Sequence, residues 1–366
     1  MGMCISGPSP QIQKINENEK NVLIIEDNNS NTSHKVSNTL VSVYSQQGTN
    51  EVNQDSALFY KKFGKGGGQF FGVFDGHGVN GHKVSRLVIN RLPKLLLEQE
   101  GYRMFEGESE LVSTYMPNEW RRECVGAFKV MDRELKLQKD FDCSCSGTTA
   151  VTLLKQDQDL LIANLGDSRA IMGTLSENGE LKAVQLTVDQ KPDLPKEAER
   201  IRKCGGRTIP NKDEPNVHRV WSASAEYMSL AMTRAFGDFY LKDYGVIAIP
   251  QITHQRLTIE DQFLVLATDG VWDVLSNEEV SSIIWAVENK EEAAQTIVEA
   301  ATVAWKRYYP SSKVDDITVV CLFLQETEKE TTLTTEEETL SRLYQPHQQQ
   351  KKVSFSENED ITEEET

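Results

Sequence analysis

The chain has 366 residues, of which 38% are hydrophobic, and its formal net charge is −17. This length allows one large domain or two smaller ones, and the acidic balance excludes the basic face that a nucleic-acid-binding protein needs. No run of about 18 apolar residues occurs, so we expect no membrane-spanning helix. The six cysteines form no CxxC pair, which indicates reduced thiols in a cytoplasmic protein.

Residues 1–40 are polar and rich in Asn, Ser and Lys, with one short apolar run, VLII, at 22–25. We expect most of this segment to be a flexible arm. It opens with MGMCIS, in which Gly2 fits the N-myristoylation pattern and Cys4 is placed for palmitoylation. Because two acyl chains anchor a protein far more stably than one, these residues predict attachment to the plasma membrane. A chance match to so short a pattern is the alternative.

Periodic apolar runs predict one folded domain over residues 41–325. Strands are expected at 41–45, 56–62, 69–75, 148–154, 160–165, 168–173, 262–269 and 317–324. Helices are expected at 80–99, 117–138, 195–204, 277–288 and 291–308. The last helix has an apolar face made of Ala294, Ile297, Val298, Ala301 and Trp305, which we interpret as core packing. The segment GKGGG at 64–68 lacks the ending of a phosphate-binding loop and predicts a hairpin turn.

Residues 326–366 carry 12 acidic and 4 basic side chains and so contribute −8 to the net charge. Their composition predicts an acidic, disordered tail. The rest of the chain carries the remaining −9. Because an acidic surface repels phosphate, phosphate chemistry on this chain would need bound cations.

Four short segments place an aspartate beside an apolar strand-like run. They are FDGHG at 74–78, LGDSR at 165–169, ATDGVWD at 267–273 and VDDITVV at 314–320. Asp75, Asp269 and Asp315 could meet at the rim of a β-sheet, where unpaired carboxylates would repel one another. Mg²⁺ and Mn²⁺ bind such carboxylates together. Two ions that share a bridging carboxylate could activate a water molecule, which suits hydrolysis of a phosphomonoester.

The acidic segments belong to a longer ordered series. The series reads FFGVFDGHG, SGTTAVTLL, LIANLGDSRAIMG, LAMTRAFGD, FLVLATDGVWDVLS and VDDITVV. It resembles the metal-dependent serine/threonine phosphatases of the protein phosphatase 2C type across residues 40–325. The resemblance implies an α+β fold, an α-β-β-α sandwich of two mostly antiparallel sheets flanked by helices. The MGMCIS start and the acidic tail are further similar to a plant subgroup of that family.

The resemblance implies a metal-ligand role for several residues. Asp75 is similar to the carboxylate that bridges two metal ions, and Gly76 to the residue whose backbone carbonyl binds one of them. Asp269 and Asp315 are similar to the remaining direct ligands. Asp316 is the alternative to Asp315, but many family members have Asn at the second position, which favours Asp315.

The same resemblance implies roles for four further residues. Asp55 matches an acidic residue at the edge of the site that acts through bound water. Asp167 and Asp273 match carboxylates of a third, weaker metal site. His77 is similar to the general acid that protonates the leaving oxygen of serine or threonine. A hydrogen-bonding turn histidine is the alternative for His77.

Other residues of these motifs have structural interpretations. We expect Arg169 to be structural and Trp272 to pack in the core. Arg234 and Asp238 in MTRAFGD predict a buried ion pair or a loop anchor.

The chain departs from the family where many members carry an Arg or Lys that contacts the substrate phosphate. Thr49 and Asn50 stand there, and Gln54 stands where some members have Glu. We therefore expect phosphate binding to depend on the metal ions and water. We also expect the KM for the phosphorylated substrate to be higher than in family members that have the basic residue.

These observations predict a monomeric phosphatase that acts on phosphoserine and phosphothreonine in proteins, with two Mg²⁺ or Mn²⁺ ions and a third, weaker one. The alternative is a catalytically weak, phosphatase-like binding module tethered to a membrane.

Overall fold

The computed structural model describes residues 21–25, 39–64, 67–98, 116–210, 217–224, 228–311 and 313–325. All of them lie in a unit that spans Met1–Gln325, and Glu326–Thr366 form a second unit. Over the described ranges, no helix combines the length and the apolar character needed to cross a bilayer. The predicted tail and the predicted acylation sites Gly2 and Cys4 lie outside the described residues.

One layer of the first unit is a six-stranded sheet. Its strands, in spatial order, are β1 (Val22–Ile25), β3 (Ser56–Phe63), β4 (Gly68–Phe74), β7 (Ala150–Gln156), β8 (Asp159–Leu165) and β15 (Gln251–Arg256). Neighbours pair antiparallel except β1 and β3, which are parallel. The antiparallel pairing of β3 with β4 confirms the predicted hairpin at 64–68. β4 is buried along its whole length, as expected for a strand that is covered on both faces.

The second layer is a five-stranded antiparallel sheet. Its strands, in spatial order, are β10 (Leu181–Gln185), β9 (Arg169–Leu175), β16 (Asp261–Ala267), β17 (Ile317–Phe323) and β2 (Val41–Gln46). Thus β17, the last strand among the described residues, lies between β16 and β2 and pairs with both. Every residue of β17 is buried.

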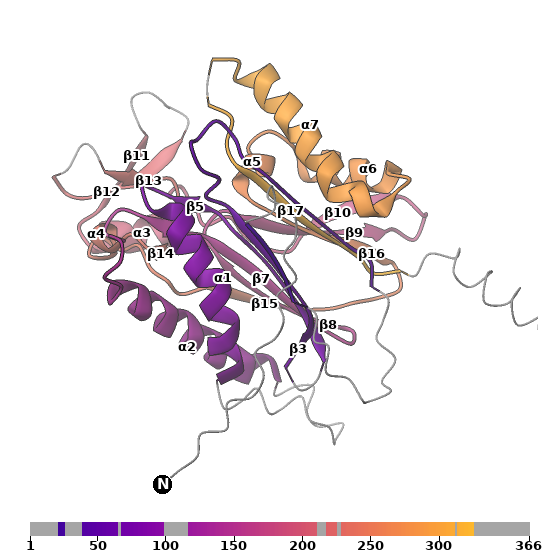
Figure 1. Cartoon of the computed structure of the whole chain (residues 1–366), viewed down its shortest axis with the longest axis horizontal. Coiled ribbons are helices and arrows are strands. Elements are labelled where there is room, and N and C mark those ends of the chain that lie inside the picture. The colour runs from indigo at the N-terminus through magenta and orange to yellow at the C-terminus, as the bar shows by residue number, and fades with distance from the viewer. Residues whose placement is uncertain are drawn as a thin grey trace, which may run out of the picture. The chain divides into compact units, whose positions relative to one another are not determined.

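The two sheets pack face to face and a pair of helices covers each outer face (Figure 1). Alternate apolar residues of both sheets form the central core, among them Phe71, Leu153, Met172, Leu266 and Val320. Helices α1 (Gly81–Glu98) and α2 (Met116–Lys136) pack on the six-stranded sheet. Helices α6 (Asn277–Ala286) and α7 (Ala293–Tyr308) pack on the five-stranded sheet. This arrangement confirms the predicted α-β-β-α sandwich.

The apolar face of α7 contributes to the core as the sequence predicted. Ala294, Ile297, Val298 and Ala301 are fully buried, and Trp305 packs against them. The other elements of the described residues are shorter than these sheets and helices. They are β5 (Gly76–His77), β6 (Gly147–Thr148), β14 (Phe236–Gly237), β11 (Arg207–Pro210), β12 (His218–Trp221), β13 (Ser229–Leu230), α3 (Pro195–Lys203), α4 (Phe239–Lys242), α5 (Asp269–Trp272) and the 3-10 helix η3 (Lys290–Glu292). In the small sheets, β6 lies between β14 and β5, and β12 lies between β11 and β13.

Two differences from the sequence predictions concern strands at sheet edges. The run 22–25 was predicted within a flexible arm, but it forms β1 and pairs with β3 from Val22 against Ala57 onward. Strands β10 and β15 were not predicted, because their outer positions are partly exposed and polar. An edge strand that is half solvated lacks the continuous apolar run by which buried strands are recognised.

Candidate active site

Three aspartates from three separate strand ends converge at one end of the sandwich. Asp75 follows β4, Asp167 follows β8 and Asp269 follows β16 as the first residue of α5. One carboxylate oxygen from each lies within 4.8 Å of the others. Strand ends are rigid, so this convergence does not depend on flexible loops.

The cluster has the electrostatic character of a cation site. Burial and the neighbouring carboxylates raise the pKa of Asp75 and of Asp269 well above the ordinary range. Asp167 is completely buried, and its Oδ1 has no hydrogen-bond partner among the described residues. Carboxylates that are crowded and short of donors are stabilised by a divalent cation, so these residues fit metal binding.

The adjacent residues Asp315 and Asp316 make different contacts. Asp316 accepts hydrogen bonds from the backbone N–H groups of Gly48 and Gln54, both at 2.8 Å, and so anchors the segment before β3. Asp315 accepts a bond from the Asp316 N–H at 2.8 Å, and its charge raises the pKa of Asp55, Asp75 and Asp269. Burial raises the pKa of Asp315 itself to about 6. Asp316 is thus occupied by two backbone donors, whereas Asp315 interacts electrostatically with the buried aspartates.

Asp55 lies just before β3 and is 1% exposed. Its Oδ2 accepts a hydrogen bond from the hydroxyl of Thr268 at 2.8 Å. Thr268 immediately precedes Asp269, so this bond joins the two chain segments that carry acidic residues. Burial and the charge of Asp316 raise the pKa of Asp55.

His77 is held by a carboxylate. Its Nε2 lies 2.6 Å from Oδ2 of Asp238, while Nδ1 is buried without a hydrogen-bond partner among the described residues. Burial lowers the pKa of His77, but the charge and hydrogen bond of Asp238 outweigh burial and raise it. A Cβ on Gly147 would collide with both the His77 ring and the Asp238 carboxylate. Glycine at 147 is therefore required for this pair to form.

Gly76 is confined by backbone on two sides. A Cβ there would meet the carbonyl oxygens of Gln54 and Gly81. The absence of a side chain lets the turn after Asp75 pack directly against the start of α1. This close packing fixes the backbone between Asp75 and His77.

Lys191 is a component of the site that the sequence predictions missed. Its Nζ lies 3.1 Å from Oδ2 of Asp167 and 3.7 Å from Oδ1 of Asp273. The charge of Asp167 raises the pKa of Lys191. The residue lies in DQKPD, a segment without strand or helix periodicity. The one available signal was a lysine in an otherwise acidic loop.

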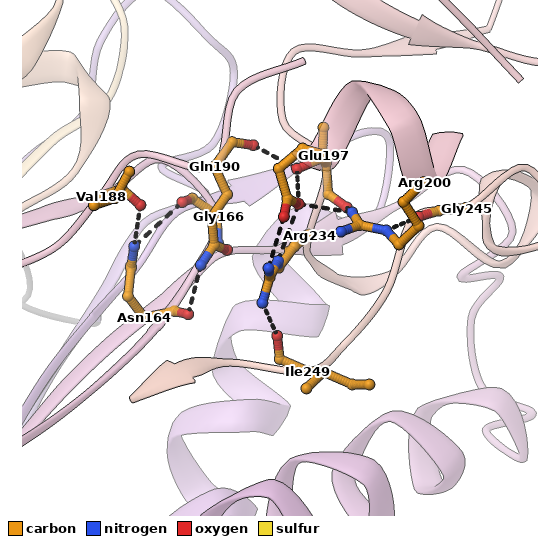
Figure 2. A network of polar contacts seen from close by, with 10 residues as sticks. Asn164, Gly166, Val188, Gln190, Glu197, Arg200, Arg234, Gly245 and Ile249 are labelled. Carbon is orange, nitrogen blue, oxygen red and sulfur yellow. Dashed lines mark hydrogen bonds and ion pairs between the residues drawn. The ribbon is translucent and has the colours of Figure 1, made fainter. Parts of the chain in front are cut away.

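Arg234 and Asp238, predicted to form a buried ion pair or a loop anchor, each have a different partner. Arg234 pairs with Glu197 of α3 at 2.7 Å, and its Nη1 donates to the carbonyl of Ile249 at 2.8 Å (Figure 2). Arg200 contacts the same carboxylate at 2.7 Å. Asp238 instead binds His77. The role of Glu197, which is buried on the same face of α3 as Ile201, was not predicted.

The structural interpretations of Arg169 and Trp272 are supported by their contacts. Arg169 forms a two-pronged ion pair with Asp189, at 3.0 and 2.6 Å. Its guanidinium lies 5.0 Å from the centre of the Trp272 ring. The Trp272 indole N–H donates to the carbonyl of Ala267 at 2.8 Å.

Comparison with known proteins agrees with this fold. The family described as Protein phosphatase 2C matches residues 39–304. The chain is 50% identical over 333 residues to probable protein phosphatase 2C 72 of Arabidopsis thaliana, covering 90% of this chain and 99% of that protein. It is 43% identical over 360 residues to probable protein phosphatase 2C 12 of Oryza sativa subsp. japonica, covering 89% and 92%. Both are plant proteins, as the predicted subgroup implied.

A solved structure shows the same fold. The serine-threonine phosphatase 2C of Toxoplasma gondii superposes with a TM-score of 0.72 at 26% identity, covering 78% of this chain and 95% of that one. This likeness extends to the sandwich of two sheets, the architecture described above. The chain belongs to the protein phosphatase 2C family. It is accordingly a serine/threonine protein phosphatase, and its substrates are phosphoproteins.

Proposed function

We propose that the chain removes phosphate from serine and threonine at a site that holds two divalent cations, Mg²⁺ or Mn²⁺. The observation that carries this proposal is the convergence of Asp75, Asp167 and Asp269 within 4.8 Å. The ligands would be the carboxylates of Asp75, Asp269 and Asp315 and the backbone carbonyl of Gly76. When bound, the cations would activate a water molecule and offset the charge of the phosphate.

The protein's own groups orient the reactants around these ligands. Asp55 is held by Thr268, the residue before the proposed ligand Asp269, and would accept a hydrogen bond from water at the site. Asp316 holds the segment 48–54 against the site through two backbone hydrogen bonds. Since these contacts exist before substrate binds, the site does not have to reorganise during the reaction.

His77 is the proposed proton donor to the leaving oxygen. Asp238 occupies Nε2 at 2.6 Å and favours the protonated ring, so Nδ1–H remains for donation. An alkoxide is a poor leaving group and needs this proton more than a phenolate does. This proposal is supported by the position of His77 on β5, two residues after Asp75, and by the charge of Asp167, which also raises the pKa of His77.

Phosphate binding in this chain is proposed to rest on the cations. Thr49 donates from its hydroxyl and its N–H to the carbonyl of Val314, at 3.0 and 2.9 Å. It thus secures the loop beside Asp315. We expect a KM above that of relatives that have a basic residue here.

Outside the described residues, we propose that Gly2 is myristoylated and Cys4 palmitoylated when Met1 is the true start. The phosphatase would then act at the cytoplasmic face of the plasma membrane, as a monomer. The long polar segment between Cys4 and β1 would serve as the tether.

Turnover of a phosphothreonine peptide, measured with Mn²⁺ and again with excess EDTA, tests the proposed function. We expect steady turnover with Mn²⁺ and none with EDTA, restored by added Mn²⁺. A matched control is Asp243→Asn, which removes a carboxylate at the end of α4 and should leave turnover unchanged. Turnover that survives EDTA would contradict the metal site. Absence of peptide turnover with Mn²⁺ would favour the alternative, a catalytically weak binding module.

A further inference from the structure

Lys191 places a positive charge on the carboxylate cluster, and the proposed reaction does not use it. Its Nζ lies between Asp167 Oδ2 and Asp273 Oδ1, at 3.1 and 3.7 Å. The Asp167 side chain is fully buried, whereas those of Lys191 and Asp273 are 31% and 44% exposed. The ammonium therefore stands between the buried cluster and the solvent.

The backbone brings Lys191 and Asp167 together. Gln190 accepts a hydrogen bond from the Gly166 N–H at 2.8 Å through its side chain, and its own N–H donates to the Gly166 carbonyl at 3.0 Å. Its amide also donates to the Asn164 carbonyl at 3.1 Å (Figure 2). Three bonds thus clamp Gln190 to the end of β8. Lys191 follows Gln190 and Asp167 follows Gly166, so these bonds bring Lys191 and Asp167 close together.

A buried ion-pair network also holds Gln190 in place. The Thr233 N–H donates to the Gln190 carbonyl at 2.8 Å, and the Thr233 hydroxyl donates to Glu197 at 2.6 Å. Glu197 is in turn held by Arg234 and Arg200 (Figure 2). The backbone at Lys191 is therefore held one residue away from this network, which keeps the side chain within reach of the carboxylates.

We propose that Lys191 is a tethered cation that competes with an additional divalent ion for Asp167 and Asp273. The inference rests on the proposed function, because it requires divalent ions at the neighbouring carboxylates. An ammonium that belongs to the chain cannot be diluted away, so a metal ion must displace it to bind these two side chains. Lys191 would act through Asp167 as a positioning residue: it balances the buried charge and limits the site to the ions at Asp75, Asp269 and Asp315.

Mn²⁺ binding to the full chain tests this proposal. The protein is stripped with EDTA, dialysed and titrated with Mn²⁺, while free Mn²⁺ is followed by electron paramagnetic resonance. Lys191→Gln removes the charge and keeps most of the length. We expect it to tighten the weakest Mn²⁺ site by at least about tenfold, because one nearby positive charge is removed at low dielectric. Lys191→Arg keeps the charge and should bind as wild type does.

Lys203→Gln is the matched control, because Lys203 pairs with Glu199 on the exposed face of α3. A Lys191→Gln isotherm identical to that of wild type would overturn the proposal, as would an equal tightening in Lys203→Gln. Suppose that wild type binds Mn²⁺ and hydrolyses the peptide, while Lys191→Gln binds Mn²⁺ no more tightly than wild type. Only the proposed role of Lys191 is then refuted, and the proposed function stands. If wild type binds no Mn²⁺, both the proposed metal site and the proposed role of Lys191 are refuted. Circular dichroism checks folding, and Lys191→Met carries the same test if Lys191→Gln does not fold.

Discussion

His77 Nε2 and Asp238 Oδ2 lie 2.6 Å apart although 161 residues separate them in the chain. The three short strands β5, β6 and β14 produce this contact, because β6 pairs with both of the others. Asp238 has φ of 50°, a left-handed conformation that aspartate and asparagine tolerate better than most residues. The pair is thus assembled by the sheet and not by local sequence.

Asp269→Asn should abolish phosphatase activity with little effect on folding. The amide keeps the shape of the carboxylate but loses the charge that would bind a cation. We expect kcat to fall on the order of a thousandfold, or several kcal/mol in activation free energy. Steady-state kinetics with Mn²⁺, with circular dichroism as a folding check, measures the effect. More than a tenth of the wild-type kcat in the variant would contradict the assignment.

His77→Gln should slow phosphopeptide hydrolysis by about a hundredfold or more, because a general acid is lost. Aryl phosphates should be affected much less, since phenolates leave without full protonation. The kcat ratio of the two substrates, compared between variant and wild type, is the measurement. An equal loss on both substrates would mean that His77 is a structural turn residue.

Asp238→Asn tests whether Asp238 acts through His77. Asparagine suits the left-handed backbone, so the fold should persist. We expect a loss on phosphopeptide but not on aryl phosphate, and we expect the double variant with His77→Gln to be no slower than His77→Gln alone. Residues that act as a unit are non-additive in this way. Additive losses in the double variant would show that Asp238 acts independently of His77.

Glu197→Gln should destabilise the protein by about 3 to 5 kcal/mol at pH 7, because it breaks a buried pair and leaves Arg234 and Arg200 short of a carboxylate. Burial raises the pKa of Glu197, but hydrogen bonds from Arg234, Arg200 and Thr233 outweigh burial and lower it from 4.5 to about 2. A lowered folded-state pKa gives stability that is complete above about pH 4.5 and is lost as the pH falls toward 2.

The stability difference between wild type and Glu197→Gln should therefore shrink as the pH falls through that window. Urea unfolding in EDTA at pH 7 and pH 3 measures it. Glu199→Gln, which removes an exposed pair on the same helix, should cost less than about 1 kcal/mol. A difference that stays constant between the two pH values would refute the ionic role of Glu197.

Fractionation of cells tests the proposed acylation. Wild type should be found at the membrane and Gly2→Ala in the soluble fraction. Cys4→Ser should be divided between the two, because a single myristoyl chain binds only marginally. The net charge of −17 opposes electrostatic adhesion to an anionic leaflet. Wild type in the soluble fraction, with Gly2 unmodified by mass spectrometry, would make the MGMCIS match a coincidence.

Sequence patterns predicted the elements that are buried on both faces and the carboxylates at their ends. β4, β16 and β17 have largely apolar runs, with Asp75 and Asp269 after the first two and Asp315 before the third. The positions of these proposed ligands were therefore predictable together with the strands. Asp316 could be separated from Asp315 only by resemblance, and the hydrogen bonds to Gly48 and Gln54 now provide a physical reason.

What the sequence could not predict is pairing between distant polar residues. Nothing local indicates that Asp238 binds His77 while Arg234, four residues earlier, binds Glu197. Lys191 lies in a loop without periodicity, and its partners come from β8 and from the residue after α5. Such pairs depend on which strands become neighbours, and that information is absent from any single segment.

The position of β17 between β16 and β2 has a consequence for synthesis of the protein. Until Ile317–Phe323 have left the ribosome, β16 and β2 have no strand to join them, and the second sheet cannot close. Asp315 arrives with that same strand. A nascent chain that already displays Asp75 and His77 should thus be inactive, and catalysis should begin in a single step when the final strand is inserted.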